Sequence, residues 1–496
     1  MRFAKRFHIL AAIAGFVAGV NSLSHADPKE REGGRPSEAD IFGAPADAAA
    51  NPTKPVQATG TASPPPNSSQ TSVGPATTEA DPRAAELAAP AHSFKDQFAA
   101  GTAVDNPLQI GGRYYQRLIL SGQEGRGLTN APLAAPLQFD GFLDGRPNDR
   151  LRGYINSRLS YDPTSTANAS VALDQAWLKF DIDRAVFVTA GKQHVKWGTS
   201  RFWNPTDFLS NQRRDPLLPY DLRLGSGMVK FDLPMEASRS AIYAILLLDN
   251  PSAAGTAGKT GLALRGETTA GNTVMGLDFV FRGQRSPVYG ADLTSPLGPF
   301  DIYAELAYQP RPSGSQYQLL APPTAGADLS SFVLATPRTG SATQASGGLS
   351  YSFSWKENRV ATAGIEYFYN ALGYGDIGAY PVLYATGEFQ PFFLGRHYFG
   401  LYLTAEGPDE AKRTSYTFTL LGNLSDHSYL GRIDFAWRVL TYLTFDIYLN
   451  GHFGQPGGEF RFAMQTPALT YSGTTIPAVN LPNAIFDLGL GLRLDF

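Results

Sequence analysis

The sequence predicts an all-β protein: a transmembrane antiparallel β-barrel of about 18 strands, preceded by a disordered N-terminal tail. Residues 486–496 alternate strictly between apolar side chains and small or charged ones, so this strand has one apolar and one polar face. Many earlier runs show the same period of two, and the stretch before them is too polar to fold. A wall with one face toward lipid and one toward water needs this pattern.

Residues 1–26 predict a secretory signal peptide. A basic start (Arg2, Lys5, Arg6) precedes an apolar stretch over residues 9–20 and a small-residue exit at Ala26. That stretch is too short for a comfortable membrane helix, and nothing later reaches the roughly 18 consecutive apolar residues that a spanning helix needs. Insertion through helices is therefore not expected.

Residues 27–106 are rich in Pro, Ala, Ser, Thr and Gly, with few large apolar side chains. Such a segment cannot bury enough surface to offset its ordering entropy. We expect a disordered periplasmic tail over 27–106 and an outer-membrane barrel over 107–496.

Composition narrows the classes further. The chain has no cysteine, which excludes a lipoprotein anchor, disulfides and thiolate metal sites. Its net charge of −3 argues against bulk nucleic-acid binding. Glycine (51 residues) and aromatics (12%) are abundant while hydrophobic content is only 43%, as expected for a barrel with a polar lumen or a large soluble β protein.

From residue 108 onward, runs of mostly alternating residues are separated by turn formers. The predicted strands are 108–120, 136–145, 149–161, 171–182, 185–196, 223–233, 238–249, 259–268, 272–283, 287–295, 299–308, 344–355, 359–370, 396–406, 413–423, 428–438, 440–451 and 484–496. The second and tenth are weak, which leaves sixteen strands as an alternative.

The connections alternate in length. Those after even-numbered strands are short, whereas several after odd-numbered strands are long, notably 197–222, 309–343, 371–395 and 452–483. Short periplasmic turns alternating with long extracellular loops, with both termini in the periplasm, are typical of outer-membrane barrels. A soluble sandwich need not alternate in this way, and no propeller repeat of about 40 residues is found.

The C-terminal strand also resembles the signal by which bacterial outer-membrane barrels are recognised for assembly. Its apolar positions count back in twos from a terminal aromatic residue, as Phe496, Leu494 and Leu492. The resemblance implies a bacterial outer-membrane location, contact with outer-membrane lipid, and recognition by the barrel assembly machinery.

Successive side chains of a strand point to opposite faces, so where the apolar residues face lipid, the charged residues between them face the lumen. The basic set is Arg113, Arg117, Arg150, Arg152, Arg158, Lys192, His194, Lys196 and Lys230. The acidic set, on later strands, is Asp278, Asp301, Glu305, Glu366, Asp434 and Asp446. Two opposed walls of this kind would set up a transverse field across a water-filled bore. Alternatively the charges pair and fill the barrel, although eighteen strands enclose too wide a bore for side chains alone.

The stretch 191–208 is the densest cluster of aromatic and charged residues, and it runs from the fifth predicted strand into a long loop. We expect the loop to narrow the bore, with a constriction formed by Arg201, Trp203, Asp207, Arg213 and Arg214. Its glycine-basic-Gln, Trp-Gly and Asn-Pro-x-Asp pattern resembles a loosely defined group of porin-like barrels of Gram-negative outer membranes. The resemblance implies a barrel relative and no particular substrate. The alternative places Trp197, Phe202 and Trp203 in an outer aromatic girdle.

A second aromatic group lies in the loop after the thirteenth predicted strand: Tyr374, Tyr380, Tyr384, Phe389, Phe392 and Phe393. A membrane-interface belt is the favoured interpretation, and a stacking surface for sugars is the alternative.

The sequence does not favour an enzyme. Ser425, Asp426 and His427 are adjacent, but neighbouring side chains point in different directions and this trio is expected to form a turn. The other histidines beyond residue 106 are His194, His397 and His452; no metal-site spacing, glycine-rich phosphate loop or nucleophile elbow is found, so no metal or cofactor is expected.

The expected function is passive diffusion of small hydrophilic, preferentially anionic, solutes. One competing hypothesis is an export barrel for a charged polysaccharide, resembling the alginate exporters, which would be favoured if loops masked the acidic wall. The other is a plugged structural or assembly barrel whose tail binds peptidoglycan or a periplasmic partner. Many porins are trimers, and the sequence leaves a homotrimer open.

Overall fold

The computed structural model describes residues 107–496, except 219, 249–259, 284, 323, 329–330, 357–358, 410–411, 472–473 and 477. The predicted signal peptide (1–26) and periplasmic tail (27–106) therefore lie outside the described residues. No helix in the part that is described is long and apolar enough to span a membrane.

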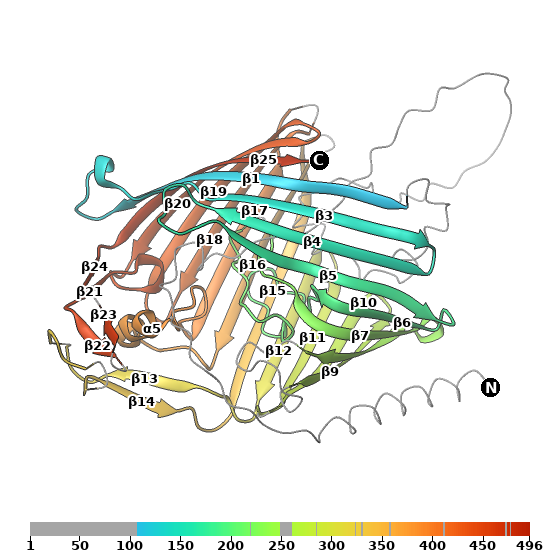
Figure 1. Ribbon diagram of the computed structural model, residues 1–496, viewed down its shortest axis with the longest axis horizontal. Helices are drawn as coiled ribbons and strands as arrows, with labels where there is room; N and C mark the ends of the chain where they lie inside the picture. The colour runs from blue at the N-terminus through green and yellow to red at the C-terminus, as the bar shows by residue number, and fades with distance from the viewer. Residues whose placement is uncertain are drawn as a thin grey trace.

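Eighteen long strands form a closed antiparallel barrel (Figure 1). They are β1 (Leu108–Gln123), β3 (Leu137–Asn148), β4 (Leu151–Tyr161), β5 (Ser170–Ile182), β6 (Val186–Gln193), β7 (Ser226–Met235), β8 (Ser240–Leu247), β9 (Gly261–Ala270), β10 (Thr273–Arg282), β11 (Val288–Leu297), β12 (Phe300–Gln309), β15 (Ala342–Lys356), β16 (Arg359–Asn370), β17 (His397–Glu406), β18 (Thr414–Asn423), β19 (Ser428–Leu440), β20 (Leu443–Gly454) and β25 (Ala484–Asp495). The eighteen-strand prediction is confirmed, with strand ends shifted by a few residues at most, and the two weakly predicted strands are present as β3 and β11.

Closure of the barrel joins the two ends of the described chain. Each strand pairs with its sequence neighbour, and β25 pairs antiparallel with β1, so that Arg113 faces Asp495 and Ser121 faces Asp487 across the ladder. Pairing the last strand with the first removes both sheet edges, which lipid cannot satisfy with hydrogen bonds.

The alternation of side chains produces an apolar outside and a polar inside. On β10, Leu277 is 69% exposed while its neighbour Asp278 is buried. On β12, Leu306 is exposed while its neighbour Glu305 is buried. Because exposed leucines of this kind recur around the barrel, its outer surface suits hydrocarbon, and its polar residues face the interior.

Short turns lie at one end of the barrel and long connections at the other. The turn between β5 and β6 is tight: Asp183 and Arg184 both have positive φ (51° and 52°), and the Ala185 N–H donates to the Ile182 carbonyl at 3.0 Å. Two consecutive left-handed residues form the kind of hairpin turn whose twist matches the flanking strands.

The long connections contain the remaining elements: η1 (Leu128–Asn130), β2 (Leu133–Ala134), β13 (Ser315–Leu319), β14 (Val333–Pro337), η5 (Ile377–Ala379), α5 (Tyr380–Thr386), η6 (Glu459–Arg461), β21 (Met464–Thr466), β22 (Leu469–Tyr471), β23 (Thr474–Ile476) and β24 (Val479–Leu481). A short 3-10 helix, η2 (Glu236–Ser238), forms one of the tight turns. Helix α5 begins with a proline in its first turn and ends at Gly387, whose φ of 73° closes it.

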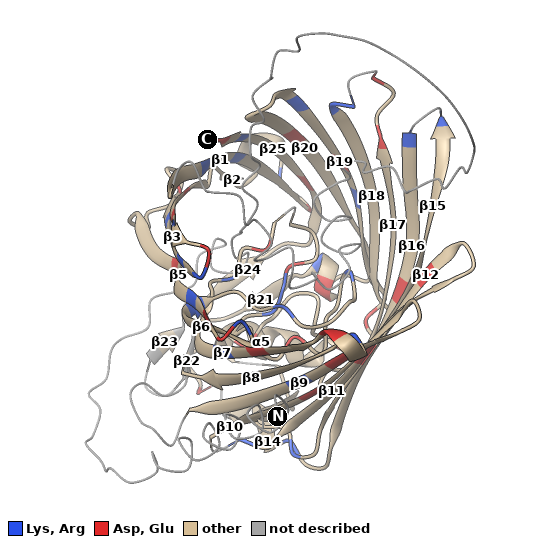
Figure 2. Ribbon diagram, turned by 90° about the vertical axis from the view of Figure 1, so that its right-hand side faces the viewer, with Lys and Arg blue, Asp and Glu red and all other residues tan. Residues whose placement is uncertain are grey.

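The connection between β6 and β7, residues 194–225, folds into the bore and is called the inserted loop below (Figure 1, the green segment inside the barrel). It contributes to both large apolar clusters of the interior. One joins it to β16, β17, β18 and β19, and the other joins it to β7, β8, β9 and β10. Figure 2 shows chain segments lying between the two sides of the barrel.

Candidate solute pathway

Glu305 on β12 holds the first part of the inserted loop. Its carboxylate accepts the backbone N–H groups of Thr199 and Ser200, both at 2.6 Å, and that of Thr206 at 3.2 Å, with the Thr206 hydroxyl at 2.7 Å. Gly198 has φ of 89°, and a Cβ there would lie 2.6 Å from the same carboxylate. Glycine is therefore required where the loop meets the wall.

Glu366 on β16 holds the next three residues. Its carboxylate accepts the backbone N–H groups of Arg201 (2.8 Å), Phe202 (3.1 Å) and Trp203 (2.8 Å), and the hydroxyl of Tyr303 (2.9 Å). Successive N–H groups converging on one carboxylate form a nest for an anion. The two glutamates together fix the loop to the β12–β16 side of the bore.

Aromatic packing seals this attachment. Trp203 is fully buried; its ring stacks on Phe368 with centroids 5.7 Å apart, and its Nε1 donates to the Phe392 carbonyl at 2.9 Å. Phe202 meets Tyr402 edge to face at 5.9 Å. These rings lie inside the barrel, so an outer girdle role for Trp203 and Phe202 is wrong. Trp197 is likewise buried in the cluster that joins the loop to β7–β10.

The loop also reaches the other side of the bore. Tyr220 lies between two guanidinium groups, with Arg113 Cζ (β1) 4.5 Å and Arg493 Cζ (β25) 4.9 Å from its ring centroid. Since β1 lies eight strands from β12 by the shorter way round the closed barrel, the loop bridges nearly opposite walls. A segment anchored on both sides of a wide bore narrows it.

Ion pairs within the inserted loop restrict its motion. Arg223 forms salt bridges with Asp207 and Asp221, all three within the loop. Although burial opposes it, hydrogen bonds and charge from Arg223 hold the pKa of Asp221 well below its usual value. The predicted constriction residues Arg201, Trp203, Asp207, Arg213 and Arg214 all belong to this loop. Arg201 lies over the Tyr402 ring, with Cζ 3.8 Å from its centroid, and Arg214 is buried.

On the early strands, several of the predicted lumen cations lie beside carboxylates. Arg117 is buried on β1, and Arg158 on β4 pairs with Asp140 at 2.8 Å and Asp174 at 3.2 Å. Asp174 also contacts His194 Nε2 at 2.9 Å, which places His194 on the lumen side.

Three further predicted cations lie near carboxylates or in the loop. Arg152 pairs with Asp144 at 2.8 Å, and Lys230 pairs with Asp232 at 3.2 Å. Lys196 lies in the inserted loop just after β6.

Two predicted lumen cations lie elsewhere. Arg150 precedes β4 in a tight turn, where its side chain is 51% exposed and pairs with Asp181, so it lies at the rim. Lys192 pairs in register with Ala176, which pairs with the outward Ile155. Paired residues of neighbouring strands share a face, so Lys192 points outward. Apolar residues occupy both faces of β6, so the alternation of apolar and polar side chains does not indicate which face is inward. The sequence-based assignment of Lys192 to the lumen is therefore wrong.

The acidic residues do not form an uncovered wall. Glu305 and Glu366 are only 3% and 1% exposed beneath the inserted loop. Asp278 pairs with Arg265 at 2.8 Å, and Asp434 pairs with Arg432 at 2.5 Å. The two predicted acids that remain are Asp446, which accepts the Tyr115 hydroxyl at 3.0 Å, and Asp301, which is exposed near the short-turn end of β12.

Sequence reasoning missed Arg265 and Tyr220. Arg265 alternates with the apolar Leu262 and Leu264 on β9, and this period of two was a usable signal for an inward cation. Tyr220 lies in an irregular segment where no periodicity indicates what the side chain contacts.

The second aromatic group forms a cap and not a membrane belt. Tyr374, Tyr380 and Leu383 are buried together around α5, with Phe389 packed against them. Phe392 belongs instead to the interior cluster that contains Trp203.

The Ser425–His427 trio forms a turn. Ser425 Oγ accepts the backbone N–H groups of Arg396 (2.8 Å) and His397 (3.0 Å), while Asp426 accepts the Ser428 hydroxyl at 2.6 Å. His427 has φ of 58°. Serine and aspartate thus serve the backbone and a neighbouring hydroxyl, as a turn requires. Within the described ranges, no group of three or more His, Cys, Asp or Glu side chains is placed to hold a metal ion.

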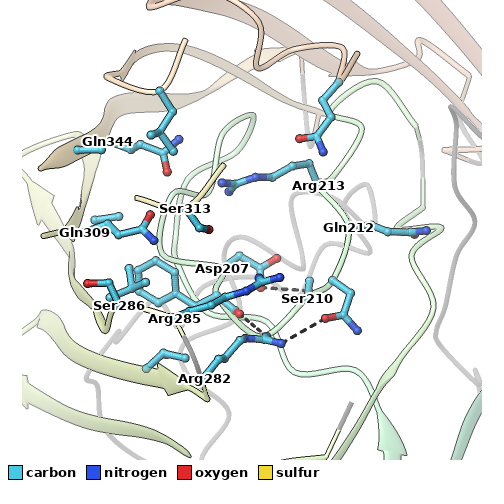
Figure 3. Close-up of a pocket in the computed structure, with 18 residues that line it drawn as sticks. Asp207, Ser210, Gln212, Arg213, Arg282, Arg285, Ser286, Gln309, Ser313 and Gln344 are labelled. Carbon is cyan, nitrogen blue, oxygen red and sulfur yellow. Dashed lines mark hydrogen bonds between the residues drawn. The ribbon is translucent and has the colours of Figure 1, made fainter. Parts of the chain in front are cut away.

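A cavity of about 460 Å³ opens between the inserted loop and the long-connection ends of β10, β11, β12 and β15 (Figure 3). Arg213, Arg282 and Arg285 line it, together with glutamine side chains and serine hydroxyls.

No family model matches the chain, and no curated protein sequence is significantly similar to it. Solved structures with a similar fold include variants of the porin of Rhodopseudomonas blastica. One double-substitution variant is 10% identical with a TM-score of 0.40, and a triple mutant is 11% identical with a TM-score of 0.39. Each comparison covers 78% of this chain and 100% of the porin.

Proposed function

We propose that this chain is a passive channel for small hydrophilic solutes in a bacterial outer membrane, with a preference for anions. The observation that carries the proposal is the inserted loop, which crosses an eighteen-stranded bore between Glu305 on β12 and Tyr220 at β1 and β25. Barrels of this size leave an aqueous channel, and an inward loop sets its size limit.

The anion preference rests on unequal covering of charge. The loop covers Glu305 and Glu366, whereas Arg113, Arg117 and Arg493 remain on the wall formed by β1 and β25. Arg113 and Arg493 share one carboxylate, Asp495, at 2.6 Å and 3.0 Å, which balances their two charges only in part. A modest positive potential along the path, and hence a mild selectivity, follows.

The remaining parts of the proposal concern processing and partners. Residues 1–26 are the signal peptide, 27–106 a periplasmic tail that contacts peptidoglycan or a periplasmic partner, and 107–496 the membrane barrel. Phe496, Leu494 and Leu492 provide the assembly signal, and a homotrimer is the proposed assembly. Solutes pass without a cofactor or energy input.

Permeation into proteoliposomes tests the function directly. Liposomes containing the refolded barrel should swell in small sugars and in sugar acids, faster in the acids than in neutral sugars of equal size. Large oligosaccharides should be excluded. Liposomes that hold folded barrel and swell no faster than empty ones would refute the channel.

A second candidate, export of an anionic polysaccharide, is supported by one observation. The inserted loop covers Glu305 and Glu366, which removes two carboxylates from the surface that a polyanion would meet. Release of uronate oligomers of increasing length from loaded liposomes distinguishes polysaccharide export from passive diffusion. Release of long chains would favour export, and a sharp length limit would favour the diffusion channel.

A further inference from the structure

Two buried carboxylates meet at the long-connection end of the barrel: Glu459 of η6 and Asp426 of the turn between β18 and β19. They are 7% and 2% exposed. The Glu459 backbone N–H donates to Asp426 Oδ2 at 2.8 Å, and Asn423 Nδ2 donates to Glu459 Oε2 at 2.8 Å and to Asp426 Oδ2 at 2.9 Å. Two carboxylates this close do not readily ionise together, because like charges repel and burial penalises each charge.

Phenol hydroxyls from two other elements also bond to this pair. Tyr398 of β17 donates to Glu459 Oε2 at 2.5 Å, and Tyr380 of α5 donates to Asp426 Oδ2 at 2.9 Å. Burial raises the pKa of Tyr380, so this phenol keeps its proton. The pair therefore joins η6 and the cap around α5 to the ends of the barrel strands.

No cation balances the two carboxylates in the part of the chain that the structure describes. Glu459 and Asp426 form no salt bridge there, and the basic side chains of the neighbouring elements have other partners. Arg461 of η6 pairs with Glu124 at 3.0 Å, and His452 of β20 contacts Asp487 at 2.8 Å. A buried acidic pair without a counter-charge is most stable when it holds a proton.

The proton belongs mainly to Glu459. Burial, with a further contribution from the charge of Asp426, raises the pKa of Glu459 to about 8 from its ordinary 4.5. Because the pKa is raised in the folded chain, the stability that the protonated group contributes is fully present below about pH 4.5 and is lost as pH rises through about 8.

A single residue, Phe392, links Glu459 to the inserted loop. Glu459 Oε1 accepts the Phe392 backbone N–H, and the Phe392 carbonyl accepts Trp203 Nε1 at 2.9 Å. Phe392 and Trp203 share one buried cluster with Phe460, whose ring centroid lies 5.7 Å from that of Phe392. A shift of Phe392 therefore reaches the inserted loop through direct contacts.

We infer that Glu459 is a positioning residue for the constriction: when protonated it holds Phe392 against Trp203 of the inserted loop, and when ionised it releases them. This inference deepens the proposed channel function and rests on it. Ionisation adds a second negative charge beside Asp426, which favours an arrangement in which water reaches η6. The inserted loop then loses one of its attachments, and the bore widens as pH rises.

Two measurements on the refolded full chain, each from about pH 6 to about pH 9, test the inference. Single-channel conductance in planar bilayers should rise with pH, with a midpoint near 8. Amides of residues 199–208, corrected for their intrinsic exchange rate, should lose protection by roughly tenfold, since ionisation is favoured about tenfold one pH unit above the pKa.

Three substitutions sharpen the test. Glu459→Gln keeps the size of the side chain and a carbonyl acceptor but cannot ionise, so it should hold the low-pH conductance and protection throughout. Asp426→Asn removes the neighbouring charge and should move the midpoint to lower pH. Glu388→Gln alters an exposed glutamate in the same long connection as Phe392; as the matched control it should keep the wild-type pH profile.

The outcomes separate the positioning role from the channel itself. Flat wild-type profiles overturn the inference even if no variant folds, and so does a folded Glu459→Gln variant that keeps the full pH dependence. Conductance that rises without loss of loop protection also overturns it. Protection that falls with pH in a barrel that passes no current would refute the channel and keep the contact, whereas a conducting barrel with flat profiles would do the reverse.

Discussion

The Glu366 carboxylate on β16 accepts the backbone N–H of Trp203, 163 residues earlier in the chain, at 2.8 Å. A glutamate that is 1% exposed and a tryptophan that is fully buried thus meet inside a barrel whose bore is wide enough for water. This contact turns the connection between β6 and β7 into part of the interior.

Replacing Glu366 by Ala should release the inserted loop. Three backbone N–H groups lose their common acceptor, and each buried donor left unsatisfied costs about 1–3 kcal/mol. We expect a larger single-channel conductance and faster proteolysis within residues 194–225. Asp301→Asn, which removes an exposed carboxylate on β12, serves as control and should leave the proteolysis rate unchanged. Unaltered conductance in Glu366→Ala would show that the loop does not limit flow.

Trp203→Ala should loosen the loop through lost packing. The indole stacks on Phe368 and lies 5.4 Å from the Tyr398 ring centroid, and truncating a buried tryptophan costs about 3–5 kcal/mol. Hydrogen exchange of the loop amides should accelerate, while that of the strands distant from the loop stays slow. Equally protected loop amides in wild type and variant would argue against this packing role.

The sequence alone predicted the strands because their signal is local. Alternation such as that of Leu277 and Asp278 follows directly from one face meeting lipid and the other the lumen. It failed at Lys192, since both faces of β6 are apolar. It placed Glu305 and Glu366 inward without indicating that a distant loop covers them. Contacts between an irregular loop and a strand 100 or more residues away leave no periodic trace.

Arg117→Gln should reduce anion preference. Arg117 is buried on the inner wall of β1, and its Cζ lies 5.5 Å from the Tyr115 ring centroid. Removing its charge lowers the positive potential along the path. Reversal potentials under a salt gradient should shift in the direction that indicates a higher permeability for cations relative to anions. Arg150→Gln, at the exposed rim, is the matched control and should change selectivity little; an equal shift in both variants would contradict the assignment of Arg117 to the pathway.

The packing between η6 and the interior cluster that contains Phe392 should be sensitive to pH through Glu459. Burial raises the pKa of Glu459 to about 8, from an ordinary value of 4.5. The pKa of Glu459 is higher in the folded than in the unfolded chain. The stability that protonated Glu459 contributes is therefore fully present below about pH 4.5 and is lost as pH rises through about 8. Glu459 accepts the backbone N–H of Phe392, so exchange of that amide, corrected for its intrinsic rate, should speed up as pH rises.

Glu459→Gln supplies the control for this pH effect. The variant cannot ionise at this position, so the rise in exchange at the Phe392 amide should disappear. A Phe392 amide that exchanges equally across the pH range in wild type, or a Glu459→Gln variant that keeps the full pH dependence, would exclude Glu459 as the responsible group.

Single-channel recording in planar bilayers tests the central claim most directly. The refolded wild-type barrel should give stable, ohmic current steps, with a reversal potential under a salt gradient that indicates mild anion preference. A folded barrel that inserts yet passes no current, even with Glu366→Ala, would contradict a diffusion channel narrowed by the inserted loop.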